Sequence, residues 1–275
     1  MNILSVDLED WHHLGFAQNK TEKIRSNLSE SLIANNTLIL LRLFKMFNAK
    51  ATFFILGETA EKYPDLIKEI QKDNYEIASH GYTHTPIFKL KPQSFEYEIR
   101  KSLEVLSKIT GQEIMGYRAP HFSIKDNFWV FRILRKNGFL YDSSFKLIPT
   151  FLQFENRRSY YEIRLEDNEK ILEFPVSVVN LMGYNIGFSG GTYFRMLPKA
   201  FIKKCIENIN IKGRTVHIYL HPRDIEESLP KLKLSIPNYL RYSGHLGNTI
   251  SKIEYLLRNF KFTSIKEYLE KQGKR

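Results

Sequence analysis

The sequence predicts an α/β fold in which helices cover a mostly parallel sheet or barrel. Along the first two-thirds of the chain, short apolar stretches alternate with stretches of helical spacing, and this order is typical of parallel sheets. Polar side chains follow several of the apolar stretches directly, as they do at the carboxyl ends of parallel strands. A chain of 275 residues is long enough for one large domain of this class.

The predicted elements follow this alternation. Pro64 predicts a first helical turn or a break within its helix. We expect strands at residues 3–6, 51–56, 75–79, 115–118, 140–143, 215–220 and 261–263. We expect helices at residues 30–47, 58–72, 93–109, 126–137, 198–209, 248–258 and 264–271.

Two regions depart from the alternation. Residues 145–195 contain short extended pieces and Gly-rich turns, which indicate an irregular β insertion. Residues 225–246 are interpreted as a long loop, and residues 246–275 as a C-terminal helical extension. No low-complexity linker or internal repeat divides the chain, so residues 1–275 are predicted to form a single domain.

Composition limits the class of protein. Hydrophobic residues make up 43% and charged residues 26%, as in globular proteins. The net charge of +11 favours anionic partners, but a solvated basic surface explains it more simply, and no nucleic-acid-binding motif is found. We therefore expect no nucleic-acid partner. The single cysteine, Cys205, excludes an intramolecular disulfide and a cysteine-based zinc site.

The N-terminus lacks the pattern of a signal peptide, because Asp7, Glu9 and Asp10 interrupt the apolar start. Apolar runs such as residues 38–41 are too short to span a membrane. These features predict a cytoplasmic protein without a transmembrane segment. Peripheral contact with a membrane or with a lipid-linked substrate stays open, as does the oligomeric state.

The polar residues that follow the predicted strands are the main functional signal. They come from five separate strand ends, which parallel topology brings to one rim of a sheet. These residues are Asp7, Glu9, Asp10, His80, His84, Arg118, Asp142 and His221.

The histidines and acids among them favour a metal site. His80 and His84 lie four residues apart, and two imidazoles with one carboxylate form a common open zinc site. Three carboxylates after one buried strand would repel one another unless a cation or proton lay among them. Incidental polar histidines and solvated acids are the alternative interpretation.

Arg118 and His221 suggest further roles. An arginine at a strand end can orient a carboxylate through paired hydrogen bonds. A histidine opposite a metal can protonate a leaving amine, because its pKa lies near neutrality. The alternatives are a surface arginine and a hydrogen-bonded core histidine.

Taken together, these residues resemble the polysaccharide deacetylase family, also called the NodB-homology family or carbohydrate esterase family 4. The likeness covers residues 1 to about 225. Narrower features, including residues 6–11, 190–195 and 247–249, resemble a subgroup linked to exopolysaccharide biosynthesis. The five motifs that carry the family likeness are Asp7-Leu-Glu-Asp10, His80-Gly-Tyr-Thr-His84, Arg118-Ala-Pro120-His-Phe122, Tyr141-Asp142-Ser-Ser and Leu220-His221-Pro222.

The resemblance implies a distorted (β/α) barrel of about seven strands and a role for each motif. Asp7 would be the general base and His221 the general acid. Arg118 would orient Asp7, and Asp142 would tune a catalytic histidine. The turn at Pro120, His121 and Phe122 would bind substrate, with the backbone N–H of His121 helping to hold the oxyanion.

The resemblance also implies a divalent metal ion, which we expect to be Zn²⁺, bound by His80 and His84. The family motif has two adjacent aspartates, whereas the acids here are spread as Asp-x-Glu-Asp. We expect Asp10 to be the third ligand, with Glu9 as the alternative carboxylate.

The implied activity is hydrolysis of N-acetyl groups from an amino-sugar-containing polysaccharide or glycan precursor, with release of acetate. Two alternatives are kept: hydrolysis of a small linear or cyclic amide on the same fold, and a catalytically inactive carbohydrate-binding homologue.

Overall fold

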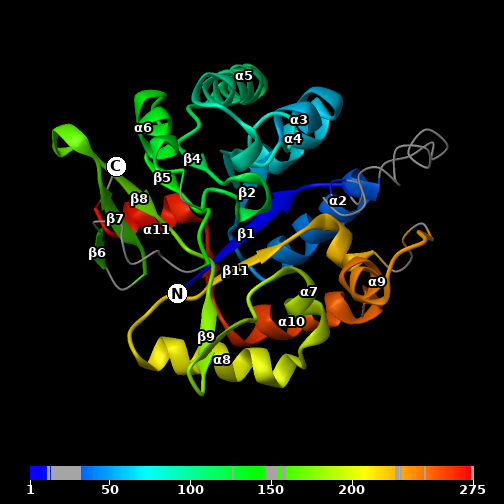
Figure 1. The fold of residues 1–275 in the computed structure, drawn as a ribbon. Coiled ribbons are helices and arrows are strands. Elements are labelled where there is room, and N and C mark those ends of the chain that lie inside the picture. The colour runs from blue at the N-terminus through cyan, green and yellow to red at the C-terminus, as the bar shows by residue number, and fades with distance from the viewer. Residues whose placement is uncertain are drawn as a thin grey trace.

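A 10-stranded sheet forms the centre of the protein in this computed structural model (Figure 1). The structure describes residues 1–10, 13, 32–125, 127–146, 154–156, 159–226, 229, 231–244 and 246–273. The strand order is β11-β1-β2-β3-β4-β5-β8-β7-β6, and β12 pairs with β1. The strands are β1 (Asn2–Leu8), β2 (Thr52–Ile55), β3 (Glu76–Ser79), β4 (Gly116–Tyr117), β5 (Tyr141–Asp142), β6 (Phe154–Asn156), β7 (Tyr161–Arg164), β8 (Lys170–Glu173), β11 (His217–Leu220) and β12 (Phe262–Thr263).

The predicted fold class is confirmed. The run from β11 to β8 consists of seven parallel strands, and the antiparallel strands β7 and β6 extend it. Within the described residues β11 and β6 are the two ends of this order, so the sheet is a curled half-barrel rather than a closed one. A separate hairpin joins β9 (Val178–Leu181) and β10 (Tyr184–Gly187).

Helices connect the parallel strands. Both alternatives predicted for Pro64, a first helical turn and a break, are present, because α3 ends before it and α4 begins at it. Gly111 ends α5 in the left-handed conformation (φ 65°), which glycine adopts readily. The helices are α2 (Leu32–Met46), α3 (Gly57–Lys62), α4 (Pro64–Lys72), α5 (Pro92–Thr110), α6 (Trp129–Lys136), α7 (Gly191–Met196), α8 (Lys199–Ile211), α9 (Ile236–Ser243), α10 (Thr249–Asn259) and α11 (Ile265–Lys271).

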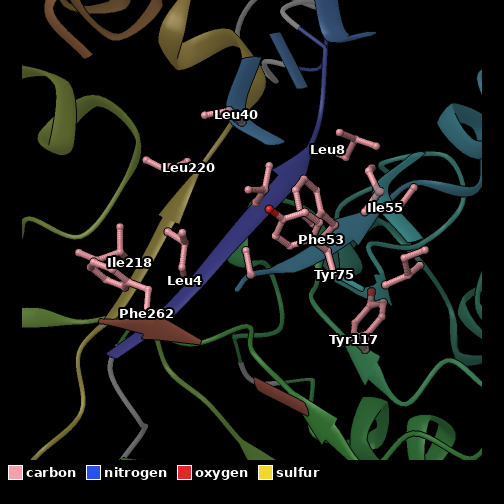
Figure 2. Close-up of a cluster of buried hydrophobic side chains, with 14 of the residues drawn as sticks. Leu4, Leu8, Leu40, Phe53, Ile55, Tyr75, Tyr117, Ile218, Leu220 and Phe262 are labelled. Atoms are coloured by element: carbon pink, nitrogen blue, oxygen red, sulfur yellow. The ribbon is translucent and has the colours of Figure 1, made fainter. Parts of the chain in front are cut away.

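Side-chain alternation along β1 separates a packed face from a polar one. Leu4, Val6 and Leu8 belong to the main hydrophobic core, together with residues of the neighbouring strands and of α2 (Figure 2). Ser5 and Asp7 point the other way, because successive side chains of a strand lie on opposite faces, and both are buried. The inner face of β1 therefore carries polar groups toward the carboxyl end of the sheet.

Two local predictions were wrong. Residues 191–196 form the helix α7 instead of an extended piece, and α9 lies inside the predicted loop 225–246. Pro237 near the start of α9 is a helix-start signal that the sequence interpretation passed over. Within the ranges that the structure describes, no helix combines the length and apolar character that crossing a membrane requires.

Candidate active site

Five parallel strands deliver the predicted polar residues to one rim. Asp7 lies near the end of β1, Asp142 ends β5, and His80, Arg118 and His221 directly follow β3, β4 and β11. All five side chains are buried. The convergence predicted from the sequence is present, although one ligand and one supporting residue differ from the expectation.

Glu9 lies between the two histidines of the second motif. Its Oε1 atom is 2.9 Å from Nε2 of His80 and 2.9 Å from Nε2 of His84. Burial alone would raise the pKa of Glu9, but the nearby charge of His84 and the hydrogen bonds of both histidines hold this pKa well below its usual value. An ionised carboxylate therefore faces two imidazole nitrogens in a buried site.

The donor set fits a divalent cation. Nδ1 of His80 lies 2.8 Å from the carbonyl oxygen of Arg118, and a carbonyl can only accept, so Nδ1 carries the hydrogen. Protonated His80 would donate from Nε2 to Glu9, whereas neutral His80 would offer its Nε2 lone pair to a cation held together with Glu9. A backbone carbonyl behind a metal-binding imidazole is a common support. The three atoms lie within 4.8 Å of one another.

The expectation that Asp10 joins the histidines is not what the geometry shows. Asp10 is in neither of the two potential metal-binding groups found among the described residues, whereas Glu9 is in both. The chain turns directly after β1, because the backbone N–H of Glu9 donates to the carbonyl oxygen of Asp7 at 2.8 Å. The Glu9 carboxylate thereby lies on the same side as that of Asp7 and next to both histidines.

Arg118 holds Asp7, as the third motif implied. Its Nη1 atom donates to Oδ1 of Asp7 at 2.5 Å, and the guanidinium is fully buried. It also donates to the hydroxyls of Ser5 and Ser143 and to the carbonyl of Ser143. With its donors directed in this way, Arg118 fixes the orientation of the Asp7 carboxylate.

Asp142, which was expected to tune a catalytic histidine, contacts Ser144 instead. Its carboxylate accepts from the hydroxyl of Ser144 at 2.6 Å and from the backbone N–H of Ser144 at 3.1 Å. The Ser144 hydroxyl in turn accepts from the N–H of Ala119 at 2.8 Å. Asp142 thus supports the Arg118–Ala119 segment, and the carboxylate found beside the general-acid candidate is another one.

That carboxylate is Asp224. Its Oδ2 atom lies 3.0 Å from Nδ1 of His221, and Nε2 of His221 lies 3.9 Å from Oδ2 of Asp7. Burial would lower the pKa of His221, but the charge and hydrogen bond of Asp224 raise it above its usual value. His221 is therefore protonated more readily than a free histidine, as a general acid requires.

The turn Pro120–Phe122 forms a wall of the site. His121 (φ 58°) and Phe122 (φ 55°) are both left-handed, a conformation that costs non-glycine residues about 1–3 kcal/mol each and is common at functional sites. The His121 ring packs on His84 at 4.4 Å, and burial lowers its pKa to about 4. Phe122 packs edge-on against Tyr219 at 5.1 Å.

The sequence interpretation missed Asp224 and its neighbour Arg195 as parts of the site. A signal for Asp224 was present, because an acid three residues after His221, with Pro222 between, has the spacing of a capping box. Arg195 lies on α7, a helix that was not predicted, and the resemblance of residues 190–195 to a subgroup assigned it no role.

Two family models match this chain. The model described as polysaccharide deacetylase matches residues 17–141, and a domain of unknown function (DUF3473) matches residues 152–270. The boundary between them passes through the site: the first segment holds His80, His84 and Arg118, whereas the second holds His221 and Asp224.

Curated relatives agree with the first model. A peptidoglycan-N-acetylglucosamine deacetylase of Bacillus cereus is 36% identical over 83 residues, covering 30% of this chain and 30% of the relative. A peptidoglycan deacetylase of Helicobacter pylori is 29% identical over 160 residues, covering 57% of this chain and 50% of the relative. This chain thus spans half or less of the length of these two relatives.

Solved structures share the fold. A Mycobacterium smegmatis structure assigned to the polysaccharide deacetylases covers 100% of this chain and 92% of its own, with a TM-score of 0.64 and 18% identity. An allantoinase structure covers 95% of this chain and 85% of its own, with a TM-score of 0.59 and 14% identity. At such identities the likeness shows the fold alone.

The rim of polar residues lies on a half-barrel whose fold these solved structures share. Within this fold, residues 17–141 match the polysaccharide deacetylase family, also called the NodB-homology family or carbohydrate esterase family 4.

Proposed function

We propose that this protein hydrolyses the N-acetyl groups of an amino-sugar-containing glycan and releases acetate. The observation that carries the proposal is the position of the Glu9 carboxylate, 2.9 Å from Nε2 of both His80 and His84, with Asp7 and His221 beside it. Glu9, His80 and His84 would hold a divalent cation, for which Zn²⁺ suits two imidazoles and one carboxylate. When bound, such a cation supplies Lewis-acid chemistry and makes water a better nucleophile.

The remaining residues supply the proton transfers. Asp7, held by Arg118, accepts a proton from water as the water oxygen attacks the acetamide carbonyl. The backbone N–H of His121, in the strained turn, would donate to the oxyanion, a type of interaction worth about 3 kcal/mol. His221 then protonates the departing nitrogen from Nε2, the C–N bond breaks, and acetate and a free sugar amine leave.

Purified protein should release acetate from N-acetylated chito-oligosaccharides or from peptidoglycan fragments. Replacement of Asp7 by Asn should lower kcat by about 10²–10⁴-fold, because the amide cannot accept the proton. Chelation should abolish acetate release, and added Zn²⁺ should restore it. Activity that survives both chelation and His80→Ala would contradict the proposal.

Hydrolysis of a small amide is the second candidate, and the shared fold of the allantoinase structure favours testing it. Release of acetate from glycans without turnover of allantoin or simple amides would favour the glycan. The reverse result would favour the small-amide activity. An absence of both activities in metal-loaded protein would favour an inactive carbohydrate-binding homologue.

A further inference from the structure

His221 is held from behind by a single carboxylate oxygen. Oδ2 of Asp224 accepts from the backbone N–H of His221 at 2.9 Å and from its ring Nδ1 at 3.0 Å. Asp224 is fully buried, and it lies in the 3₁₀ turn Pro222–Ile225 that begins directly after His221. The same contact therefore fixes both the backbone and the ring of His221.

Arg195 of α7 lies behind Asp224. Its Nη1 atom is 3.6 Å from Oδ1 of Asp224, and both side chains are fully buried. The Arg195 guanidinium also donates to the carbonyl oxygens of Arg241 and Tyr242 in α9. A buried arginine directed by backbone carbonyls is a fixed positive charge, so it balances the charge of Asp224 without competing for His221.

Lys252 of α10 fixes the position of Arg195. Its Nζ atom donates to the carbonyl oxygens of Phe194, Arg195 and Leu197, at 2.8, 2.6 and 2.7 Å. These carbonyls lie at the C-terminal end of α7, where a cation is favourable. A continuous set of buried polar contacts thus runs from Lys252 through Arg195 and Asp224 to His221.

Every member of this set lies within residues 152–270, the segment that matches the domain of unknown function. Asp142, by contrast, bonds Ser144 and supports the Arg118–Ala119 segment. The two buried acids therefore support opposite sides of the site.

We propose that Asp224, backed by Arg195, is the positioning residue for His221, and that the segment matching the domain of unknown function supplies the general-acid half of the site. Asp224 accepts from Nδ1–H and so leaves Nε2 of His221 to face Asp7 and the substrate. The catalytic part of this inference rests on the proposed function. After Nε2 gives its proton to the departing nitrogen, His221 is the neutral Nδ1–H tautomer, which Asp224 stabilises.

The first test reads the tautomer of His221 and needs no activity. ¹⁵N NMR of histidine-labelled, zinc-loaded protein should show the Nδ1–H form when His221 is neutral, with the signal assigned by its loss in His221→Gln. Asp224→Ala should remove this preference, whereas Asp142→Asn should leave it in place. An Nε2–H form in wild-type protein, or a preference lost in Asp142→Asn and kept in Asp224→Ala, would overturn the proposal.

The second test is kinetic. Asp224→Ala should lower kcat for acetate release by about 10–100-fold, with KM within about threefold of wild type and one zinc retained per chain. Arg195→Met should also lower kcat for acetate release, but by a smaller factor. If Asp224→Ala does not fold, Asp224→Asn replaces it in both tests with smaller effects expected, because its amide oxygen can still accept both bonds of His221 but carries no negative charge. An unchanged kcat in the folded variant overturns the positioning role.

The two proposals fail separately. Wild-type protein that releases no acetate would contradict the deacetylase function, while the tautomer measurement would still decide the role of Asp224.

Discussion

Glu9 and Asp10 are adjacent acids with different surroundings. Only Glu9 faces His80 and His84, because it shares the side of the chain that carries Asp7. Glu9→Gln should therefore reduce bound zinc from one per chain to a small fraction, as measured by inductively coupled plasma mass spectrometry after desalting. Asp10→Asn is the matched control and should keep its zinc. The opposite pattern would restore Asp10 as the ligand.

Substitution of Gly190, directly before α7, tests the close packing of this segment against Tyr219. A Cβ at this position would lie 2.2 Å from ring carbons of Tyr219, whose ring lies 5.6 Å from that of His221. The backbone at Gly190 is extended (φ −179°), so the cost of a side chain is steric alone. Gly190→Ala should lower the free energy of unfolding by about 1–3 kcal/mol and reduce kcat.

Gly247 provides the control for that substitution, because a Cβ there meets no atom within 4 Å. Urea unfolding and acetate release should show Gly247→Ala close to wild type. Equal effects of the two substitutions would exclude the contact with Tyr219 as the cause.

At the scale of elements, strands β5 and β8 bring two buried acids together. Asp142 and Glu173 are direct partners in the parallel pairing, and both are fully buried. Burial and the neighbouring Asp142 raise the pKa of Glu173 well above its usual value of 4.5. Glu173 therefore takes up a proton more readily than a free carboxyl, and its Oε1 atom accepts from the backbone N–H of Phe145 at 3.0 Å.

This pair predicts a pH-dependent stability. A carboxyl whose pKa is higher in the folded state contributes stability below its unfolded pKa, and this contribution is lost as the pH rises through the folded value. Glu173→Gln stays neutral, so its free energy of unfolding relative to wild type should increase from pH 5 to pH 8. This difference in the free energy of unfolding should grow by about 1.4 kcal/mol for each unit by which folding raises the pKa of Glu173.

Urea unfolding at several pH values measures this difference, with the exposed Glu270→Gln as control. A difference between Glu173→Gln and wild type that stays constant from pH 5 to pH 8 would show that Glu173 is ionised in the folded protein.

At the scale of the whole molecule, the two halves of the chain share one sheet. β1 lies between β2 from the first family segment and β11 from the second, and it also pairs with β12. Removing the second half would expose both the edge of β1 and its apolar face. This arrangement supports the prediction of a single domain over residues 1–275.

That prediction has a direct test. The full chain should unfold in one cooperative transition when followed by circular dichroism and by fluorescence. Residues 1–145 alone should show no cooperative transition, because β1 would lack β11 and β12. Two separate transitions in the full chain would indicate two domains.

Much of the fold could be predicted from the sequence, because periodicity and chain order are local properties. The alternation of apolar and amphipathic stretches predicted the parallel sheet, and Pro64 predicted the break between α3 and α4. The helix α7 was missed, since six residues carry too little periodicity and its start depends on packing against Tyr219.

The sequence by itself determined which chemical groups reach the rim, because parallel strands of fixed order must end on the same side. His80, His84, Arg118, Asp7 and His221 were all identified in this way. Only the tertiary structure decided how they are partnered. Side-chain direction selected Glu9 over Asp10, and the close approach of α7 placed Arg195 behind Asp224. Such choices depend on distances of a few ångströms between segments far apart in the chain, which no local pattern encodes.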